Sequence, residues 1–207
     1  MSVVSIVSRK GGSGKTTVAL HVAVAGQSAG KAACIIDTDP QASAAIWGDW
    51  RDSQPPEVLT CPPSRLRATV DKLHRGGMGL IVVDTPPHAD DAAREAVRVA
   101  DLVVIPTRPR SFDLQALEGI ADLILANRTP SFVMLNGVPA RANQILAHAR
   151  SYIASLGLAI CPVFLGERAS FHNYSAAGAV AGEMDPDGKA AAEIEALWQW
   201  VVSTLEG

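Results

Sequence analysis

The sequence predicts a single α/β domain, built on a doubly wound, mostly parallel sheet flanked by helices. Short apolar runs alternate along the chain with longer stretches of helical spacing, which is the order that a parallel sheet with crossover helices requires. The runs are continuous rather than alternating in polarity, as in strands that are buried on both faces. The length of 207 residues suits one domain, and no linker or repeat divides residues 1–207.

Taken in order, the β-branched apolar runs predict strands over residues 3–7, 33–36, 80–83, 102–105, 132–135 and 159–164. The Ala- and Leu-rich stretches between and after them predict helices over residues 16–28, 64–75, 90–100, 112–127, 143–156 and 188–205. The last helix carries one apolar stripe, made of Ile194, Leu197, Trp198, Val201 and Leu205. Two Pro-Pro pairs predict that residues 54–63 form a loop.

Composition narrows the class of function. The net charge of −3 excludes a global basic field, so any nucleic-acid surface must be a local patch. Three separated cysteines without a CxxC pair, and five histidines without metal spacing, argue against a disulfide framework or a zinc site. No apolar run approaches the ~20 residues of a membrane span, and no signal peptide is visible. The sequence therefore predicts a cytoplasmic protein.

The strongest motif follows the first strand and opens the first helix. Its glycines allow backbone N–H groups to wrap a phosphate, and the helix N-terminus adds positive potential. Lys15 is expected to reach the β- and γ-phosphates of ATP, or the β-phosphate of ADP, and the Thr16 hydroxyl to take a Mg²⁺ position. The predicted nucleotide-binding residues are Lys10, Gly11, Gly12, Ser13, Gly14, Lys15, Thr16 and Thr17. Arg9 stands where the standard pattern has its first glycine, and Lys10 adds a second lysine.

With this deviant loop, the chain resembles the ParA/MinD family of ATPases, and within it the small ParA-type partition ATPases. The resemblance extends to Asp37-Thr38-Asp39-Pro40-Gln41 after the second strand and to Asp84-Thr85-Pro86-Pro87 after the third. Asn136 follows the fifth strand, where the family places an adenine contact. The matching motifs occur in family order over residues 3–136.

The resemblance implies roles for these side chains. Asp39 positions or polarises the attacking water, Asp37 and Asp84 help to hold Mg²⁺ and its water shell, and Asn136 contacts adenine. Lys10 reaches the phosphates of a partner subunit, so that ATP holds a homodimer together. Three of them have a plainer alternative: Asp39 as a helix N-cap, Lys10 on its own phosphates, and Asn136 as a turn residue.

Family members differ in what the dimer binds. The acidic C-terminal helix has the wrong charge for anionic lipid, so no membrane partner is expected, and Trp198 and Trp200 are read as core residues. Non-specific DNA is the expected partner, held by an arginine patch and giving a nucleoid-associated location. The candidates are Arg141, Arg150 and Arg168 in one group, and Arg94, Arg98, Arg108 and Arg110 in the other.

The resulting prediction is a Mg²⁺-dependent ATPase for partition of a plasmid or chromosome, stimulated by a small centromere-binding, ParB-like protein. The first alternative is a positioning ATPase of the same kind for another cargo, such as a chemoreceptor cluster or a carbon-fixing compartment. The second is a ligase or kinase that uses ATP on a metabolite. The motifs do not separate the first two.

Overall fold

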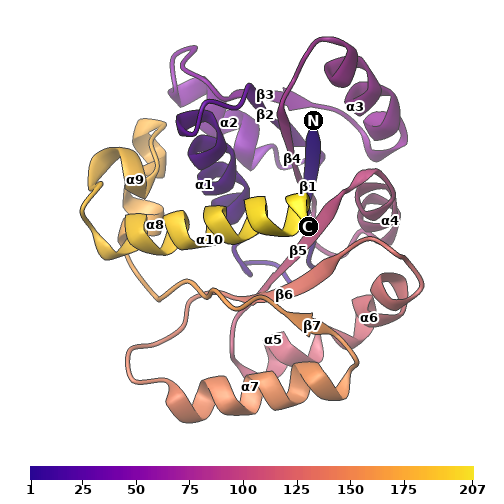
Figure 1. Cartoon of the computed structure of the whole chain (residues 1–207), viewed down its shortest axis with the longest axis vertical. Coiled ribbons are helices and arrows are strands. Elements are labelled where there is room, and N and C mark those ends of the chain that lie inside the picture. Colours follow the sequence, from indigo (N-terminus) through magenta and orange to yellow (C-terminus); the bar gives the residue numbers. More distant parts are fainter.

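Seven parallel strands form the sheet of the computed structural model, which describes residues 1–207, in the order β3-β2-β4-β1-β5-β6-β7 (Figure 1). The strands are β1 Ser2–Ile6, β2 Ala33–Asp37, β3 Glu57–Thr60, β4 Leu80–Asp84, β5 Leu102–Thr107, β6 Ser131–Leu135 and β7 Ala159–Ile160. The chain passes from β1 to strands on one side of it, and from β5 to strands on the other. This reversal beside β1 opens a crevice at the carboxyl ends of the strands.

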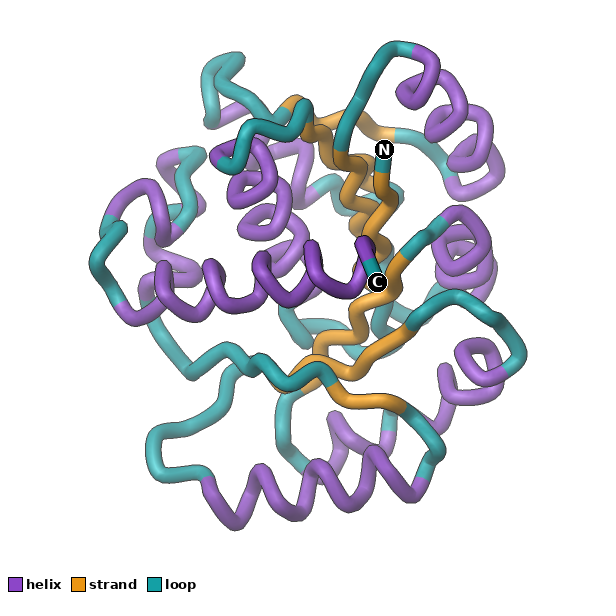
Figure 2. The backbone as a smooth tube through the Cα atoms, in the orientation of Figure 1, coloured by secondary structure: helices purple, strands orange, loops and turns teal.

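Helices cover both faces of the sheet (Figure 2). They are α1 Lys15–Ser28, α2 Ser43–Trp50, α3 Leu66–Arg75, α4 Asp90–Val99, α5 Ser111–Gln115, α6 Glu118–Leu125, α7 Asn143–Ser155, α8 Ser170–Asn173, α9 Ala181–Met184 and α10 Lys189–Glu206. Short 3₁₀ turns, η1 Pro63–Arg65 and η2 Ser175–Ala177, precede α3 and follow α8. None of the helices combines the length and apolar composition that crossing a bilayer requires.

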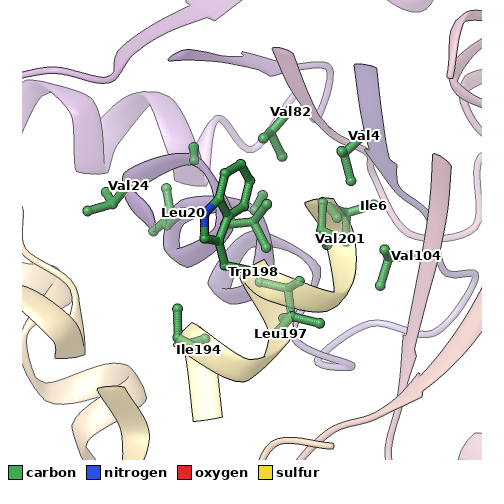
Figure 3. Packing of buried hydrophobic residues seen from close by; sticks show 14 of the residues in the cluster. Val4, Ile6, Leu20, Val24, Val82, Val104, Ile194, Leu197, Trp198 and Val201 are labelled. Atoms are coloured by element: carbon green, nitrogen blue, oxygen red, sulfur yellow. The ribbon is translucent and has the colours of Figure 1, made fainter. Parts of the chain in front are cut away.

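The sheet divides the apolar interior into two cores. One core joins α1, α2, α9 and α10 to one face, and the other joins α3 to α7 to the opposite face. In the first core, α10 lies across α1 with Ile194, Leu197, Trp198 and Val201 buried (Figure 3). Each such side chain stabilises the fold by about 1.5–3 kcal/mol. The predicted stripe on the last helix is therefore confirmed, with Leu205 packed at its edge.

Tight packing of α10 depends on Gly26. A Cβ atom there would come within 3.1 Å of the Trp198 ring and closer still to Leu80. Trp200 packs edge-on against Phe132, with ring centroids 5.1 Å apart. Both tryptophans are thus packing residues, as predicted. Cys34 is also a fully buried apolar side chain.

Several predicted elements need correction. Residues 57–60, predicted as loop, form the edge strand β3, which is only partly buried and so lacks a continuous apolar run. The sixth run forms only the two-residue β7, since Pro162 cannot donate to a ladder. The single helix predicted over 112–127 is interrupted at Ala116–Leu117 and gives α5 and α6. Helices α2, α8 and α9 are short and were not predicted.

Candidate functional site

The glycine-rich loop between β1 and α1 lies at the carboxyl edge of the sheet. Gly12 and Gly14 have φ of +73° and +97°, values that L side chains rarely adopt. Gly14 is the N-cap of α1, whose first turn holds no acidic residue, so its N–H groups and dipole favour an anion.

This loop forms one wall of a polar pocket of about 560 Å³. Its phosphate-loop lining is Gly11, Gly12, Gly14, Lys15, Thr16 and Thr17, joined by Asp39, Gln41, Ser43 and Pro87. The rest of the lining is Arg108, Asn136, Gly137, Gly166, Glu167, Arg168, Ala169, Phe171 and His172. Only two of these residues are hydrophobic, which suits a charged ligand.

Lys15 is the buried cation of this pocket. Its side chain is 7% exposed, and Nζ donates to the Lys10 carbonyl oxygen at 3.3 Å. Burial lowers the pKa of Lys15, while the carboxylates of Asp84 and Asp39 raise it. An anion in the pocket would offset this burial, so Lys15 is placed to bind phosphate.

Thr16 and Asp84 meet beside Lys15. The Thr16 hydroxyl donates to Asp84 Oδ2 at 2.6 Å, whereas Asp84 Oδ1 is buried without a partner. Burial raises the pKa of Asp84 to about 7, and the hydrogen bond from Thr16 opposes the shift. A buried carboxylate with one unpaired oxygen fits a cation nearby.

The fit to Mg²⁺ follows from this donor set. No group of three or more His, Cys, Asp or Glu side chains is assembled to hold a metal. Mg²⁺ is commonly held by one or two protein oxygens together with water and substrate phosphates, and Thr16 with Asp84 would supply the protein's part. These residues therefore fit a nucleotide-borne Mg²⁺.

Asp37 has contacts of a different kind. Its Oδ2 accepts from the backbone N–H groups of Ala44 and Ala45 at the start of α2, and its Oδ1 accepts from that of Asp39. Burial raises the pKa of Asp37, and these three hydrogen bonds oppose that rise. The carboxylate thus anchors α2 and the turn before it, while its membership of a Mg²⁺ shell stays a prediction.

Asp39 lines the pocket two residues further on. Its Oδ1 accepts from the Gln41 N–H at 2.9 Å, which leaves the carboxylate facing the pocket edge. The alternative that Asp39 is a helix N-cap is wrong, since α2 begins at Ser43 with Ala42 as its N-cap. Gln41 and Ser43 line the same wall, so the end of the D-x-D-P-Q segment and the start of α2 border the site.

Asn136 joins the phosphate loop to the other half of the sheet. Its Nδ2 donates to the Ser13 carbonyl oxygen at 2.8 Å, and its backbone N–H donates to the Thr107 carbonyl oxygen at the end of β5. A contact to adenine stays a prediction. The Ser13 hydroxyl is buried without a partner, and Ser13 does not line the pocket, so its contact with a nucleotide also stays a prediction.

The two residues before the glycines point elsewhere. Lys10 is half-buried but is not part of the pocket lining. Arg9 donates from Nη1 to the Gly119 carbonyl oxygen at 2.8 Å and pairs through Nη2 with Asp90. The Arg9 carbonyl oxygen also accepts from the His88 N–H. Arg9 therefore connects the phosphate loop to the segment after Asp84.

Most of the arginines predicted to meet DNA have acidic partners. Arg94, Arg98, Arg110 and Arg168 pair with Asp91, Glu95, Glu167 and Glu193, respectively. Arg108 lines the pocket instead. Arg141 and Arg150 remain exposed without an ion pair. Sequence reasoning also missed the 166–169 wall of the pocket, because that loop carries no motif.

A phosphate loop at the switch point of a parallel sheet, with Lys15, Thr16 and Asp84 beside it, defines a nucleotide-binding P-loop protein. The family follows from the sequence match. Residues 4–179 match the CobQ/CobB/MinD/ParA nucleotide binding domain, and the chain belongs to this family. It is an ATPase, as the predicted resemblance to ParA and MinD implied.

Among curated proteins, the chain is 32% identical to the Maintenance of carboxysome distribution protein A of Gloeobacter kilaueensis, over 99% of this chain and 94% of that protein. It is 31% identical to Protein ParA of Rhizobium radiobacter, over 59% of this chain and 57% of that protein. The fold matches apo McdA of Cyanothece with a TM-score of 0.80 at 16% identity, covering 97% of this chain and 99% of that one. The sequence matches agree with the family assignment, and the structural match shows the same fold.

Proposed function

We propose that this chain is a Mg²⁺-ATP-driven positioning ATPase that distributes a cargo particle along DNA. The observation that carries the proposal is that Lys15, Thr16 and Asp39 line one polar pocket, while the buried Asp84 accepts a hydrogen bond from Thr16 beside it. The similarity over almost the whole chain to a carboxysome distribution protein supports the choice of cargo positioning. That similarity favours the first alternative of the sequence analysis over plasmid or chromosome partition.

In the proposed reaction, Lys15 and the backbone N–H groups of residues 11–16 hold the β- and γ-phosphates of ATP. Bound Mg²⁺ would neutralise charge on the phosphate oxygens, with Thr16 as its protein ligand and Asp84 orienting its water. Asp39, at the pocket edge, orients the water that attacks the γ-phosphate in line. Positioning and charge stabilisation therefore supply the catalysis.

Lys10 has a separate proposed role. Because its side chain does not line its own pocket, we assign it to the phosphates of a second copy across an ATP-bound homodimer. Hydrolysis would remove the shared anion and release the two copies. A cargo-bound adaptor protein would stimulate this step, in the place that the sequence analysis gave to a ParB-like activator.

Non-specific DNA is the proposed track. Residues 123–166 contain no Asp or Glu but include Arg128, Arg141 and Arg150. All three are exposed and lack ion pairs. Arg141 and Arg150 give α7 and the loop before it a local basic surface despite the net charge of −3, and Arg128 lies in the loop between α6 and β6. The paired arginines elsewhere are assigned no DNA contact.

Two experiments test this function. Hydrolysis of ATP should require Mg²⁺ and fall roughly 100-fold or more in Lys15→Ala. Binding of the protein to non-specific duplex DNA should require ATP and weaken as salt rises from about 50 to 200 mM. It should be weaker in Arg141→Ala/Arg150→Ala but unchanged in Arg94→Ala.

Deletion of the gene in its own host, followed by microscopy, then separates the cargoes. Clustering of one type of particle with normal plasmid inheritance supports positioning. Loss of a plasmid or chromosome at division, with particles evenly spaced, would favour partition.

A further inference from the structure

One side of the pocket lies over the ends of β5 and β6. Thr107 and Leu135 are register partners in these strands, so the next residues, Arg108 and Asn136, stand side by side at the carboxyl edge. β5 also pairs with β1, from which the phosphate loop emerges. A nucleotide whose phosphates lie on that loop would therefore direct its nucleoside toward Arg108 and Asn136.

Arg108 differs from its arginine neighbours at this end. Arg110 is paired with Glu167, and Arg168 donates from both Nε and Nη2 to Glu193. Arg108 makes no ion pair or side-chain hydrogen bond, although it lines the pocket. Its stem passes over Gly137, with Cγ and Nε each 3.8 Å from where a Cβ would lie. Its guanidinium is thus supported by backbone but has no polar partner.

A purine needs a flat surface, and the pocket offers few. Only two lining residues are hydrophobic. The Phe171 ring is buried and meets His21 edge-on, with centroids 5.3 Å apart, so it already belongs to the core. A guanidinium is planar, always charged and weakly hydrated, and it stacks well on aromatic faces.

We propose that Arg108 binds the nucleoside half of ATP by stacking its guanidinium on the base. The inference rests on the proposed ATP-binding function and adds a residue that determines affinity for the base. Asn136 Nδ2 is engaged by Ser13, so Arg108 supplies the planar contact beside it.

The test compares ligands with and without a base. Arg108→Ala should weaken ATP and ADP by the same factor, roughly tenfold, because the lost stacking is independent of phosphate number. Tripolyphosphate, which has no nucleoside, should bind Arg108→Ala as it binds wild type. Arg110→Ala is the matched control, two residues away and outside the lining, and should change none of the affinities. Titration calorimetry with each ligand measures all of them.

The Arg108→Lys variant keeps the positive charge but loses the planar guanidinium, so it shows which of the two binds the base. Under this proposal it binds ATP as weakly as Arg108→Ala does. Unchanged ADP affinity in Arg108→Ala would overturn the proposal. So would an equal loss for tripolyphosphate or full rescue by lysine, since either indicates a cation that binds phosphate. If wild type bound no ATP, the proposed function itself would fail, and this result is distinguishable because it appears before any substitution.

Discussion

The side-chain amide of Asn136 occupies the space that a Cβ atom on residue 14 would need. The same amide nitrogen donates to the carbonyl oxygen of Ser13, so Asn136 packs against the phosphate loop and holds it by one hydrogen bond. Gly14 is therefore required twice, by its φ of +97° and by this close approach.

Gly14→Ala should lower the free energy of unfolding by roughly 3 kcal/mol, because strain at positive φ adds to overlap with Asn136. Gly12→Ala is the control within the same loop. Its φ is +73° but nothing lies within 4 Å of the added Cβ, so it should cost only about 1 kcal/mol. Urea unfolding measures both, and equal losses would contradict the role given to Asn136.

The two aspartates of the D-x-D-P-Q segment should separate into a structural and a catalytic residue. Asp37→Ala leaves three backbone N–H groups without their acceptor and should lower the free energy of unfolding by roughly 2–4 kcal/mol. Asp39→Ala loses one partly exposed hydrogen bond and should lower it by less than about 1 kcal/mol, while hydrolysis falls steeply. Urea unfolding and ATPase assays on both variants test this assignment. A larger loss of stability in Asp39→Ala than in Asp37→Ala, with hydrolysis retained in Asp39→Ala, would contradict it.

His21 should make stability depend on pH. Its Nδ1 lies 2.7 Å from the Thr17 carbonyl oxygen, and its Nε2 accepts from the Ala181 N–H, an arrangement that suits the neutral ring. Burial lowers the pKa of His21 to about 4; His172 also lowers it, and the Thr17 contact and Glu183 raise it. In the unfolded chain the ring has its ordinary pKa of about 6.5, so on acidification it binds a proton before the folded ring does. The stabilisation is complete above about pH 6.5 and is lost as the pH falls toward 4, by up to about 3 kcal/mol.

Comparison of wild type with His21→Gln isolates this effect. Asp84, with its pKa raised to about 7, contributes the opposite slope to both proteins, so the difference between them reports on His21. Urea unfolding at pH 7, 5.5 and 4.5 should show the advantage of wild type shrinking with acid. A constant difference would count against this role of His21.

Features formed by residues that are contiguous in the chain could be predicted from the sequence. The phosphate loop, the two aspartate motifs and the buried strands are contiguous, so their residue types and spacing were sufficient. The sequence did not predict β3, because a partly exposed edge strand needs no apolar run. It also did not predict the link from Asn136 to Ser13, the anchoring of α2 by Asp37 or the position of Arg108. These depend on which strands are neighbours, and that order arises only in the folded sheet.

The central claim is that ATP joins two copies and that Lys10 acts between them. Light-scattering mass on Asp39→Ala, with ATP and with ADP, tests it most directly, because slow hydrolysis preserves the ATP state. The account predicts that Asp39→Ala has twice the mass of 21.7 kDa with ATP but remains a monomer with ADP. The double variant Lys10→Ala/Asp39→Ala should be a monomer even with ATP. A monomer in both nucleotides, or a dimer that persists without Lys10, would contradict it.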